Sequence, residues 1–488
     1  MRSYPKTIHI VTIGHDHVKE CREVVTQYYY PQYQLVVNKV LYDPEIEISI
    51  EVNPENSIVL KFQSKSHDFT DLSLIDANIP IQKQIKRQLF LFLRKITGKE
   101  LPWGTLTGIR PVKIAHSLLI KGQNQDQVKN SLAKDYFITE KKAGKLVDLA
   151  KLEIDVMYPI NKRKAVLYVG IPFCPTRCSY CSFISSTVNN RELLNAYLLA
   201  LGREIDELGA YLDENCIEIS NIYVGGGTPS VLNPSEIEKM FEQIYKHISR
   251  RKSMEITFEA GRPDTVTKEK LKVLHEMGVN RISINPQTLN EDTLKAIGRN
   301  HTAKQFFESM ELARSIGMDN INTDLILGLA NETTKDVEYS VRKVMELSPE
   351  NITIHNLSIK KSSTIKGNLE DFSFTIDSLV GEMNDISEQM LMENAYHPYY
   401  LYRQQYTQGN LENTGYTLPG KEGIYNISIM SEKTSVIGIG AGSSGKLFYP
   451  EIDLLDRMET VKDIKTYIDT IDQICERKIK QMEKVFHQ

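Results

Sequence analysis

Residues 165–181, AVLYVGIPFCPTRCSYC, contain a short apolar run that is followed directly by three cysteines. The run at 165–171 is rich in β-branched and other apolar residues, which is typical of a buried strand. Cys174, Cys178 and Cys181 follow with three and two intervening residues. A tight loop with this spacing can bring three thiolates to one small metal centre. The segment therefore predicts a strand that ends in a metal-binding loop.

The three cysteines allow three interpretations, which differ in what the thiols hold. Zinc usually takes four ligands, commonly from two paired motifs, and the sequence offers no second pair. Iron–sulfur clusters normally take four cysteines, so three would leave one iron open to a ligand other than protein. Three unrelated buried thiols would need the close spacing to be a coincidence. Since six cysteines among 488 residues are too few for a disulfide scaffold, the clustered thiols favour the iron–sulfur interpretation.

A regular alternation of strand-like and helical segments surrounds this loop. We expect strands at 165–171, 219–224, 254–259, 280–285, 321–326 and 352–357. We expect helices between them at about 191–212, 233–248, 267–277, 290–316 and 333–347. Nearly all-apolar strands separated by helices indicate a parallel sheet that is covered on both faces. Right-handed crossovers would curl six such units into a full or partial barrel, with ligands at the carboxyl ends of the strands.

Helix-start signals fall where this alternation requires them. Thr265 and Thr267 are candidate caps for a helix at 268–277, and Pro234 with Ser235 is expected to open the preceding helix. These signals support the predicted α/β core.

The regions on either side of the core have a mixed α+β pattern. The first contains strand-like stretches at 7–13, 36–41, 46–52 and 57–62, then helical ones at 79–97, 109–121 and 137–153. The last contains a helix near 376–394, a strand-like stretch at 396–406, glycine-rich turns and a closing helix over 460–484. We therefore expect three parts: an N-terminal α+β domain at 1–160 without an assigned role, the core at 161–360, and a C-terminal α+β extension at 361–488.

Composition and charge limit the partners of the chain. Lys and Arg total 59 against 63 Asp and Glu, which gives a net charge of −4. A basic surplus is usual in proteins that grip phosphate backbones, so we do not expect nucleic acid as a partner. The sequence contains no run of 18 apolar residues and begins without a secretory apolar stretch, so we expect a cytoplasmic protein without a membrane span.

The CxxxCxxC spacing after a first core strand resembles the signature of the radical S-adenosylmethionine (SAM) superfamily. This resemblance implies a (β/α)6 partial TIM barrel in which Cys174, Cys178 and Cys181 ligate a 4Fe–4S cluster. In that family the open iron binds SAM, and the reduced cluster cleaves SAM to a 5′-deoxyadenosyl radical that abstracts hydrogen. The protein supplies orientation and a dry site, and an electron donor such as flavodoxin or ferredoxin is implied.

Polar and flexible residues lie at the ends of the other predicted strands. Gly225, Gly226 and Gly227 would let the backbone approach a ligand closely, although a tight strand-to-helix turn is the alternative. Glu259 and Asp324 are carboxylates in otherwise apolar strands, where burial is costly unless the group is paired or liganded. Both are therefore better site candidates than surface acids.

The subfamily that these segments resemble, the oxygen-independent coproporphyrinogen III oxidases, implies further roles. SAM would be held by Tyr168, Gly225, Gly226, Gly227, Thr228, Gln287, Arg299 and Asp324. Glu259, the candidate catalytic residue, would lie near a second SAM, so one or two SAM molecules are implied. A guanidinium such as that of Arg299 can clamp a carboxylate through two hydrogen bonds. Without the resemblance, Arg299 and His301 would be interpreted as a solvated helix end.

Three segments are most similar to the HemZ-type branch of these proteins: LPWGTLTGIRP at 101–111, FEAGRPDT at 258–265 and GNLENTGY at 409–416. The branch implies that two propionates of coproporphyrinogen III are oxidatively decarboxylated to vinyls, which gives protoporphyrinogen IX. The glycines at 438, 440 and 442 could let a flat macrocycle or an adenosyl group approach, or form a closely packed turn.

One departure from the oxidases keeps a rival function open. The oxidases have a further cysteine two positions after the third ligand, whereas Phe183 stands here, as in haem chaperones. The alternatives are a haem-binding chaperone that inserts haem into target proteins and a radical SAM enzyme that modifies haem. His355 and His397 would then be candidate axial ligands. The expected ligand is thus a tetrapyrrole, either coproporphyrinogen III or haem.

Overall fold

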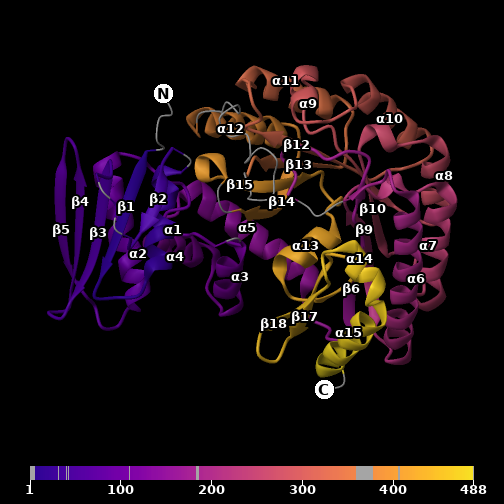
Figure 1. Ribbon diagram of the computed structural model, residues 1–488, viewed down its shortest axis with the longest axis horizontal. Helices are drawn as coiled ribbons and strands as arrows, with labels where there is room; N and C mark the ends of the chain where they lie inside the picture. The colour runs from indigo at the N-terminus through magenta and orange to yellow at the C-terminus, as the bar shows by residue number, and fades with distance from the viewer. Residues whose placement is uncertain are drawn as a thin grey trace. The chain divides into compact units, whose positions relative to one another are not determined.

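The computed structural model describes residues 6–30, 32–39, 41, 43–108, 110–182, 186–358, 377–404 and 407–486 (Figure 1). The chain forms two compact units. One consists of Met1–Ala150 with Arg403–Leu411, and the other of Lys151–Tyr402 with Glu412–Gln488. The expected domain boundaries at residues 160 and 360 stay predictions.

Six parallel strands in chain order form the centre of the larger unit. They are β6 (Lys164–Ile171), β9 (Glu218–Gly226), β10 (Glu255–Gly261), β11 (Arg281–Ile284), β12 (Ile321–Leu327) and β13 (Asn351–Asn356). Each strand pairs in parallel with the next. Among the described strands β6 and β13 do not pair with each other, so the barrel is open. This confirms the predicted α/β class and the (β/α)6 partial barrel.

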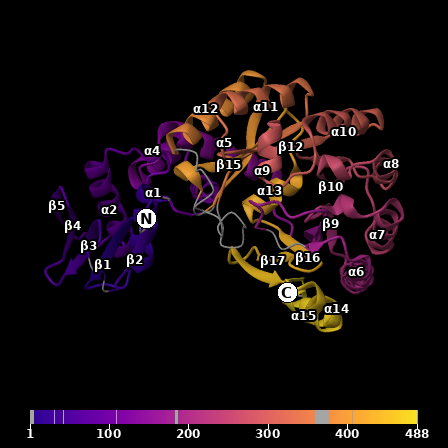
Figure 2. The same cartoon turned by 45° about the horizontal axis from the view of Figure 1, so that its top comes forward.

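Helices supply the crossovers that parallel pairing requires. The connecting helices include α6 (Arg191–Glu214), α7 (Pro234–His247), α8 (Lys268–Glu276) and α11 (Thr334–Glu346). In Figures 1 and 2, α6, α7 and α8 lie along the outer side of β9 and β10. Pro234 is the first helical residue of α7, as expected, and Asn233 caps the helix. Thr267 caps α8 as predicted, whereas Thr265 ends the short 3-10 helix before it.

The helix expected at 290–316 is wrong as a single element. The chain forms two helices there, α9 (Glu291–Ala296) and α10 (Ala303–Ser315). Gly298 has a φ of 74°, which a right-handed helix does not allow, and Thr302 then caps α10. The intervening loop carries Arg299 into the protein, where its side chain is buried. Arg299 therefore does not lie on a solvated helix end.

The C-terminal part widens the sheet at both edges. Beside β13 lie β15 (Glu412–Thr417) and β14 (His397–Arg403), and beside β6 lie β16 (Ser435–Ile439), β17 (Ser444–Tyr449) and β18 (Leu454–Glu459). β15 is antiparallel to β13, whereas β16 is parallel to β6. The predicted elements at 376–394 and 396–406 correspond to α12 (Asp377–Glu393) and β14. β15, β16 and β17 were missed because their glycines indicate turns, and β18 was missed because it is largely exposed and carries no burial pattern.

The end of the chain packs on α6 as two helices, which corrects the single helix expected over 460–484. These are α14 (Ile464–Asp469) and α15 (Ile471–Phe486). Thr470 separates them because its backbone, with φ −119° and ψ 20°, leaves the helical region.

The smaller unit has the α+β character that the sequence predicts. Its sheet follows the order β2 (Gln34–Val37), β1 (Thr7–Ile13), β3 (Ile46–Asn53), β4 (Ser57–Ser64), β5 (Asp68–Leu74). Its helices include α1 (Val18–Tyr29), α2 (Ile81–Thr97), α3 (Val112–Ile120) and α4 (Gln125–Tyr136), and α5 (Glu140–Met157) runs on into the larger unit.

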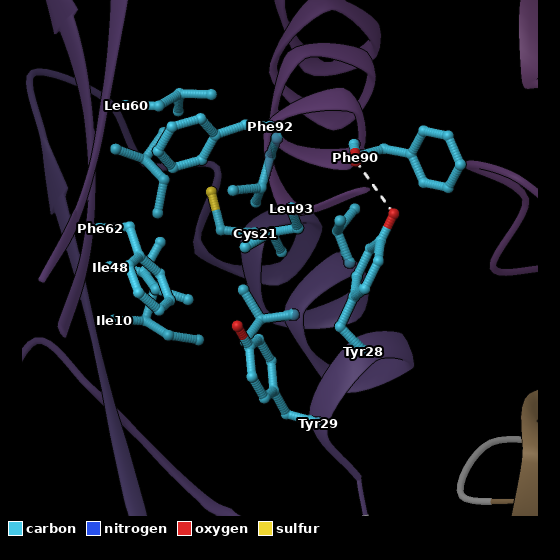
Figure 3. Packing of buried hydrophobic residues seen from close by; sticks show 14 of the residues in the cluster. Ile10, Cys21, Tyr28, Tyr29, Ile48, Leu60, Phe62, Phe90, Phe92 and Leu93 are labelled. Atoms are coloured by element: carbon cyan, nitrogen blue, oxygen red, sulfur yellow. Dashed lines mark hydrogen bonds between the residues drawn. The ribbon is translucent and has the colours of Figure 1, made fainter. Parts of the chain in front are cut away.

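Alternating strand residues build the core of the smaller unit, which Figure 3 shows. Ile10, Ile48 and Leu60 point from the sheet towards Cys21 of α1 and Phe92 of α2. The intervening residues of β3 remain partly exposed, so helices cover one face of the sheet. This core is independent of the barrel's core.

Candidate active site

The cysteine loop follows β6 directly, as the sequence predicts. Cys174 ends the two-residue strand β7 (Phe173–Cys174), and the N–H of Cys181 donates to the carbonyl of Cys178 at 3.2 Å. All three cysteine residues are partly exposed. Among the described residues, no group of three or more His, Cys, Asp or Glu side chains is close enough to hold a metal ion. The assignment of these cysteines as ligands therefore stays a prediction.

The glycines at the end of β9 pack against this loop, which is why larger residues do not fit. A Cβ on Gly227 would lie 2.5 Å from the carbonyl oxygen of Phe173 and 2.9 Å from the Sγ of Cys174. Gly226 has a φ of 119°, a conformation that favours glycine. Thr228 is buried, and its hydroxyl donates to the Sγ of Cys174 at 3.6 Å. The segment thus supports the cysteine loop whether or not it also contacts a ligand.

Glu259 lies on β10 beside the glycine segment. A Cβ on Gly225 would lie 3.0 Å from its carboxyl carbon, and the Tyr223 hydroxyl donates to its Oε1. Burial raises the pKa of Glu259 to about 7, and the negative charge of Asp324 contributes to this rise, although the Tyr223 bond opposes it. Glu259 can therefore hold or release a proton near neutral pH.

Three tyrosine rings surround this carboxyl group. The rings of Tyr223 and Tyr425 stack with centroids 4.0 Å apart, and Tyr168 lies 6.1 Å from Tyr223 and 6.4 Å from Tyr425. Burial raises the pKa of each of these hydroxyls, so they remain protonated. The prediction included Tyr168 but missed Tyr223 and Tyr425, because tyrosines are frequent in this chain and no motif marks these two.

Asp324 lies on β12 and is held from both sides. Asn322 Nδ2 donates to its Oδ1 at 2.8 Å, and His355 Nε2 lies 3.5 Å from its Oδ2. Burial would raise the pKa of Asp324, but hydrogen bonds from His355, Asn322 and Thr353 and the charge of His355 keep that pKa below its usual range. Asp324 is therefore ionised where Glu259 is close to half protonated at neutral pH.

Gln287 follows β11 and is joined to β12 through its backbone. Its N–H donates to the carbonyl of Asp324 at 3.1 Å, and its carbonyl accepts from Ile326 N–H at 2.8 Å. Its φ of 69° is unusual for a residue with a side chain, and such strain concentrates at functional sites. The structure thus brings Gln287 and Asp324 together, as the sequence predicts.

Arg299 lies in the loop between α9 and α10, next to the cysteine loop. Its Nε and Nη2 donate to the hydroxyl of Tyr180 at 3.3 and 3.1 Å. Its Nη1 is buried and has no hydrogen-bond partner among the described residues. Burial and the positive charge of Arg299 lower the pKa of His301 to about 4, so this histidine is neutral at physiological pH. Tyr180, which stands between two of the cysteines, was not predicted as a site residue.

The chemistry of these residues fits an iron–sulfur cluster with a bound anionic ligand. Three thiols on one short loop can supply the ligands, and the guanidinium of Arg299 lies beside that loop. Burying the Nη1 of Arg299 without a hydrogen-bond partner costs free energy. A bound ligand with a hydrogen-bond acceptor would remove this cost. A carboxylate is such an acceptor.

The two histidines that were candidate axial ligands lie in different places. His355 lies beside Asp324, and its Nδ1 is 3.3 Å from the hydroxyl of Tyr402. His397 instead pairs with Glu422 at 3.1 Å. The carbonyl of Glu422 accepts from Arg281 at the start of β11, which is the opposite end of the barrel strands. Phe183 lies outside the described residues.

Comparisons of the sequence and the fold with known proteins agree on one superfamily. A family model described as "Radical SAM superfamily" matches residues 168–344. The "Oxygen-independent coproporphyrinogen-III oxidase-like protein HemZ" of Bacillus subtilis is 38% identical over 83% of this chain and 82% of that protein. The "Heme chaperone HemW" of the same organism is 30% identical over 62% of this chain and 75% of that protein. The solved coproporphyrinogen III oxidase (HemN) from Escherichia coli has 21% identity and a TM-score of 0.53, covering 66% of this chain and 72% of that one, and supports the fold.

The partial barrel, the cysteine loop and these matches define the class: the chain belongs to the radical SAM superfamily. That family implies a 4Fe–4S cluster and SAM as cofactors. Within it, the chain belongs to the HemZ-type branch of the coproporphyrinogen oxidase-like proteins. None of the described helices is long and apolar enough to cross a membrane.

Proposed function

We propose that this protein is a radical SAM oxidoreductase that converts coproporphyrinogen III to protoporphyrinogen IX by oxidative decarboxylation of two propionates. The observation that carries the proposal is the 38% identity to the HemZ protein over 82% of that relative. The cysteine loop after β6, Glu259 on β10, Asp324 on β12 and the loop that carries Arg299 support it, because they all belong to the partial barrel. Flavodoxin or ferredoxin is the proposed electron donor.

The proposed site residues divide into two groups. The cluster would be ligated by Cys174, Cys178 and Cys181, and SAM would be held by Tyr168, Gly225, Gly226, Gly227, Thr228, Gln287, Arg299 and Asp324. When bound, the cluster and SAM together supply a carbon radical that removes a hydrogen atom from a propionate. One or two SAM molecules would be needed, and equilibrium binding of labelled SAM counts them.

The side chains of the barrel would bind and orient the ligands. The unpaired Nη1 of Arg299 suits a carboxylate, and ionised Asp324 offers acceptors to hydroxyl or amino groups. Glu259, whose pKa is about 7, would exchange a proton with a bound ligand, while Tyr223 keeps its carboxyl group in place. The tyrosine rings pack around this position, where Glu259 itself stays partly exposed and so can be reached by a ligand.

The reaction is tested by anaerobic incubation with coproporphyrinogen III, SAM and a reductant. We expect protoporphyrinogen IX and 5′-deoxyadenosine as products. Cys178→Ala should lose iron and SAM cleavage, whereas Cys216→Ala, an exposed cysteine outside the loop, should keep both. Unchanged iron content in Cys178→Ala would contradict the cluster assignment.

The 30% identity to the HemW chaperone favours a second candidate, a protein that binds haem and delivers it to other proteins. His355 is the better candidate axial ligand, because it lies beside Asp324 whereas His397 lies near the start of β11. The same incubation separates the candidates. Haem retained in stoichiometric amount without decarboxylation would support the chaperone, and a chemically altered haem would support a haem-modifying enzyme.

A further inference from the structure

Each interval between the cysteines is held by one buried arginine. Arg262 Nη1 donates to Thr176 in the first interval, to its Oγ1 at 2.6 Å and to its carbonyl at 3.4 Å. Arg299 donates twice to the hydroxyl of Tyr180 in the second interval. The loop is therefore fixed by contacts from two different barrel loops as well as by its own backbone.

Arg262 is rigidly placed and has no part in the proposed chemistry. Its side chain is 3% exposed, and its Nε and Nη2 donate to the two carboxylate oxygens of Asp264 at 3.0 and 2.9 Å. This fork fixes the plane of the guanidinium and leaves Nη1 directed at Thr176. Because a hydrophobic pair of similar volume is often as stable as a buried ion pair, fold stability alone does not require this arrangement.

We propose that Arg262 is a positioning residue for the iron–sulfur cluster. By holding Thr176, it fixes the backbone between Cys174 and Cys178 and so the direction of both thiols. Its permanent positive charge, held beside the loop, would also stabilise the negative charge of a reduced cluster. This inference rests on the proposed cluster, and it assigns to Arg262 a role that is separate from SAM binding.

The main test compares Arg262→Gln with Arg281→Gln. Arg281 is a matched control, because it is also buried and paired with a carboxylate, Glu255 at 3.2 Å, but lies at the start of β11. With reconstituted protein, Arg262→Gln should lose iron to a chelator about tenfold faster than the wild type. Its reduced cluster should show an altered electron paramagnetic resonance spectrum and a more negative midpoint potential. Arg281→Gln should retain the wild-type spectrum and potential.

Two further measurements keep the inference falsifiable. In iron-free protein, at a pH well above the ordinary thiol pKa of about 8.5 so that ionisation does not limit the rate, iodoacetamide should alkylate Cys174 and Cys178 faster in Arg262→Gln than in Arg281→Gln, because the loop is held less firmly. Thr176→Val removes only the hydroxyl acceptor and leaves the Asp264 pair intact, so it should speed iron loss and thiol alkylation even if Arg262→Gln fails to fold. Because Arg262 keeps its charge in Thr176→Val, the midpoint potential should change less than in Arg262→Gln.

The outcomes separate this inference from the proposed function. Wild-type chelation rates, spectrum and thiol reactivity in both Arg262→Gln and Thr176→Val would overturn the positioning role while the cluster stands. A wild-type protein that binds no iron after anaerobic reconstitution would overturn the cluster assignment, and the inference with it.

Discussion

At the scale of single residues, the raised pKa of Glu259 predicts a stability that depends on pH. Because this pKa is about 7 against an ordinary 4.5, the folded protein binds the proton more tightly than the unfolded chain. The contribution of the carboxyl group to stability is therefore largest at low pH and declines as pH rises from about 4.5 to 7. Glu259→Gln keeps an acceptor for Tyr223 but cannot ionise. As the pH rises from 5 to 8, we expect the free energy of unfolding of Glu259→Gln to increase by about 1–2 kcal/mol relative to that of the wild type.

Unfolding of the iron-free proteins by denaturant at several pH values measures this difference. Glu214→Gln, which replaces an exposed carboxylate at the last residue of α6, is the control and should follow the wild type throughout. A constant difference between Glu259→Gln and the wild type across this pH range would mean that Glu259 does not titrate there.

The sequence could single out those candidate site residues whose type is unexpected in their setting. Carboxylates in apolar strands and glycines after a strand marked Glu259, Asp324 and the segment at 225–227. Tyr425 and Arg262 could not be found in this way, since their roles arise from contacts between loops far apart in the chain. The cysteine spacing predicted a shared loop, while the directions of the thiols depend on packing.

At the scale of elements, the break between α9 and α10 brings Arg299 to the cysteine loop. Gly298→Ala should cost about 1–2 kcal/mol, because a side chain is strained at a φ of 74°. Gly317→Ala, at a φ of 91° after α10, should cost a similar amount. Only Gly298→Ala should also speed iron loss to a chelator, since it displaces the neighbouring Arg299. Equal rates of iron loss in the two variants would contradict this role of the break.

Elements with a strong local pattern were predictable, whereas breaks and edges were not. The six barrel strands are apolar almost throughout, and their predicted ranges agree closely with the structure. The edge strand β5 is exposed over nearly all its length, so it carries no burial pattern. The helices α1 and α4 were not predicted either. α1 begins after His17 without a side-chain cap, so no start signal marks it. α4 does have such a signal, the capping box of Asn124, which could have revealed it.

At the scale of the larger unit, a buried polar network ties the end of the chain to the barrel. Lys478 of α15 and Glu204 of α6 are fully buried, with Nζ and Oε1 2.5 Å apart. Lys478 also donates to the carbonyl of Gly438 at 2.6 Å, while Glu204 accepts from the N–H of Gly440 at 2.8 Å and from Tyr467 at 2.6 Å. The C-terminal helices thus hold the turn after β16, which packs on β6 just before the cysteine loop.

This network predicts that removing one of the two charges destabilises the protein more than removing both. Lys478→Met leaves the carboxyl group of Glu204 in the interior without its cation, which should cost about 3–5 kcal/mol in unfolding free energy. Lys478→Met with Glu204→Gln removes both charges and keeps an acceptor for Gly440, so most of that loss should be recovered. Lys480→Met, which breaks an exposed pair with Glu476 on the same helix, should change little. If denaturant unfolding found the double variant as unstable as Lys478→Met, the loss would come from packing of α15 rather than from an unpaired charge.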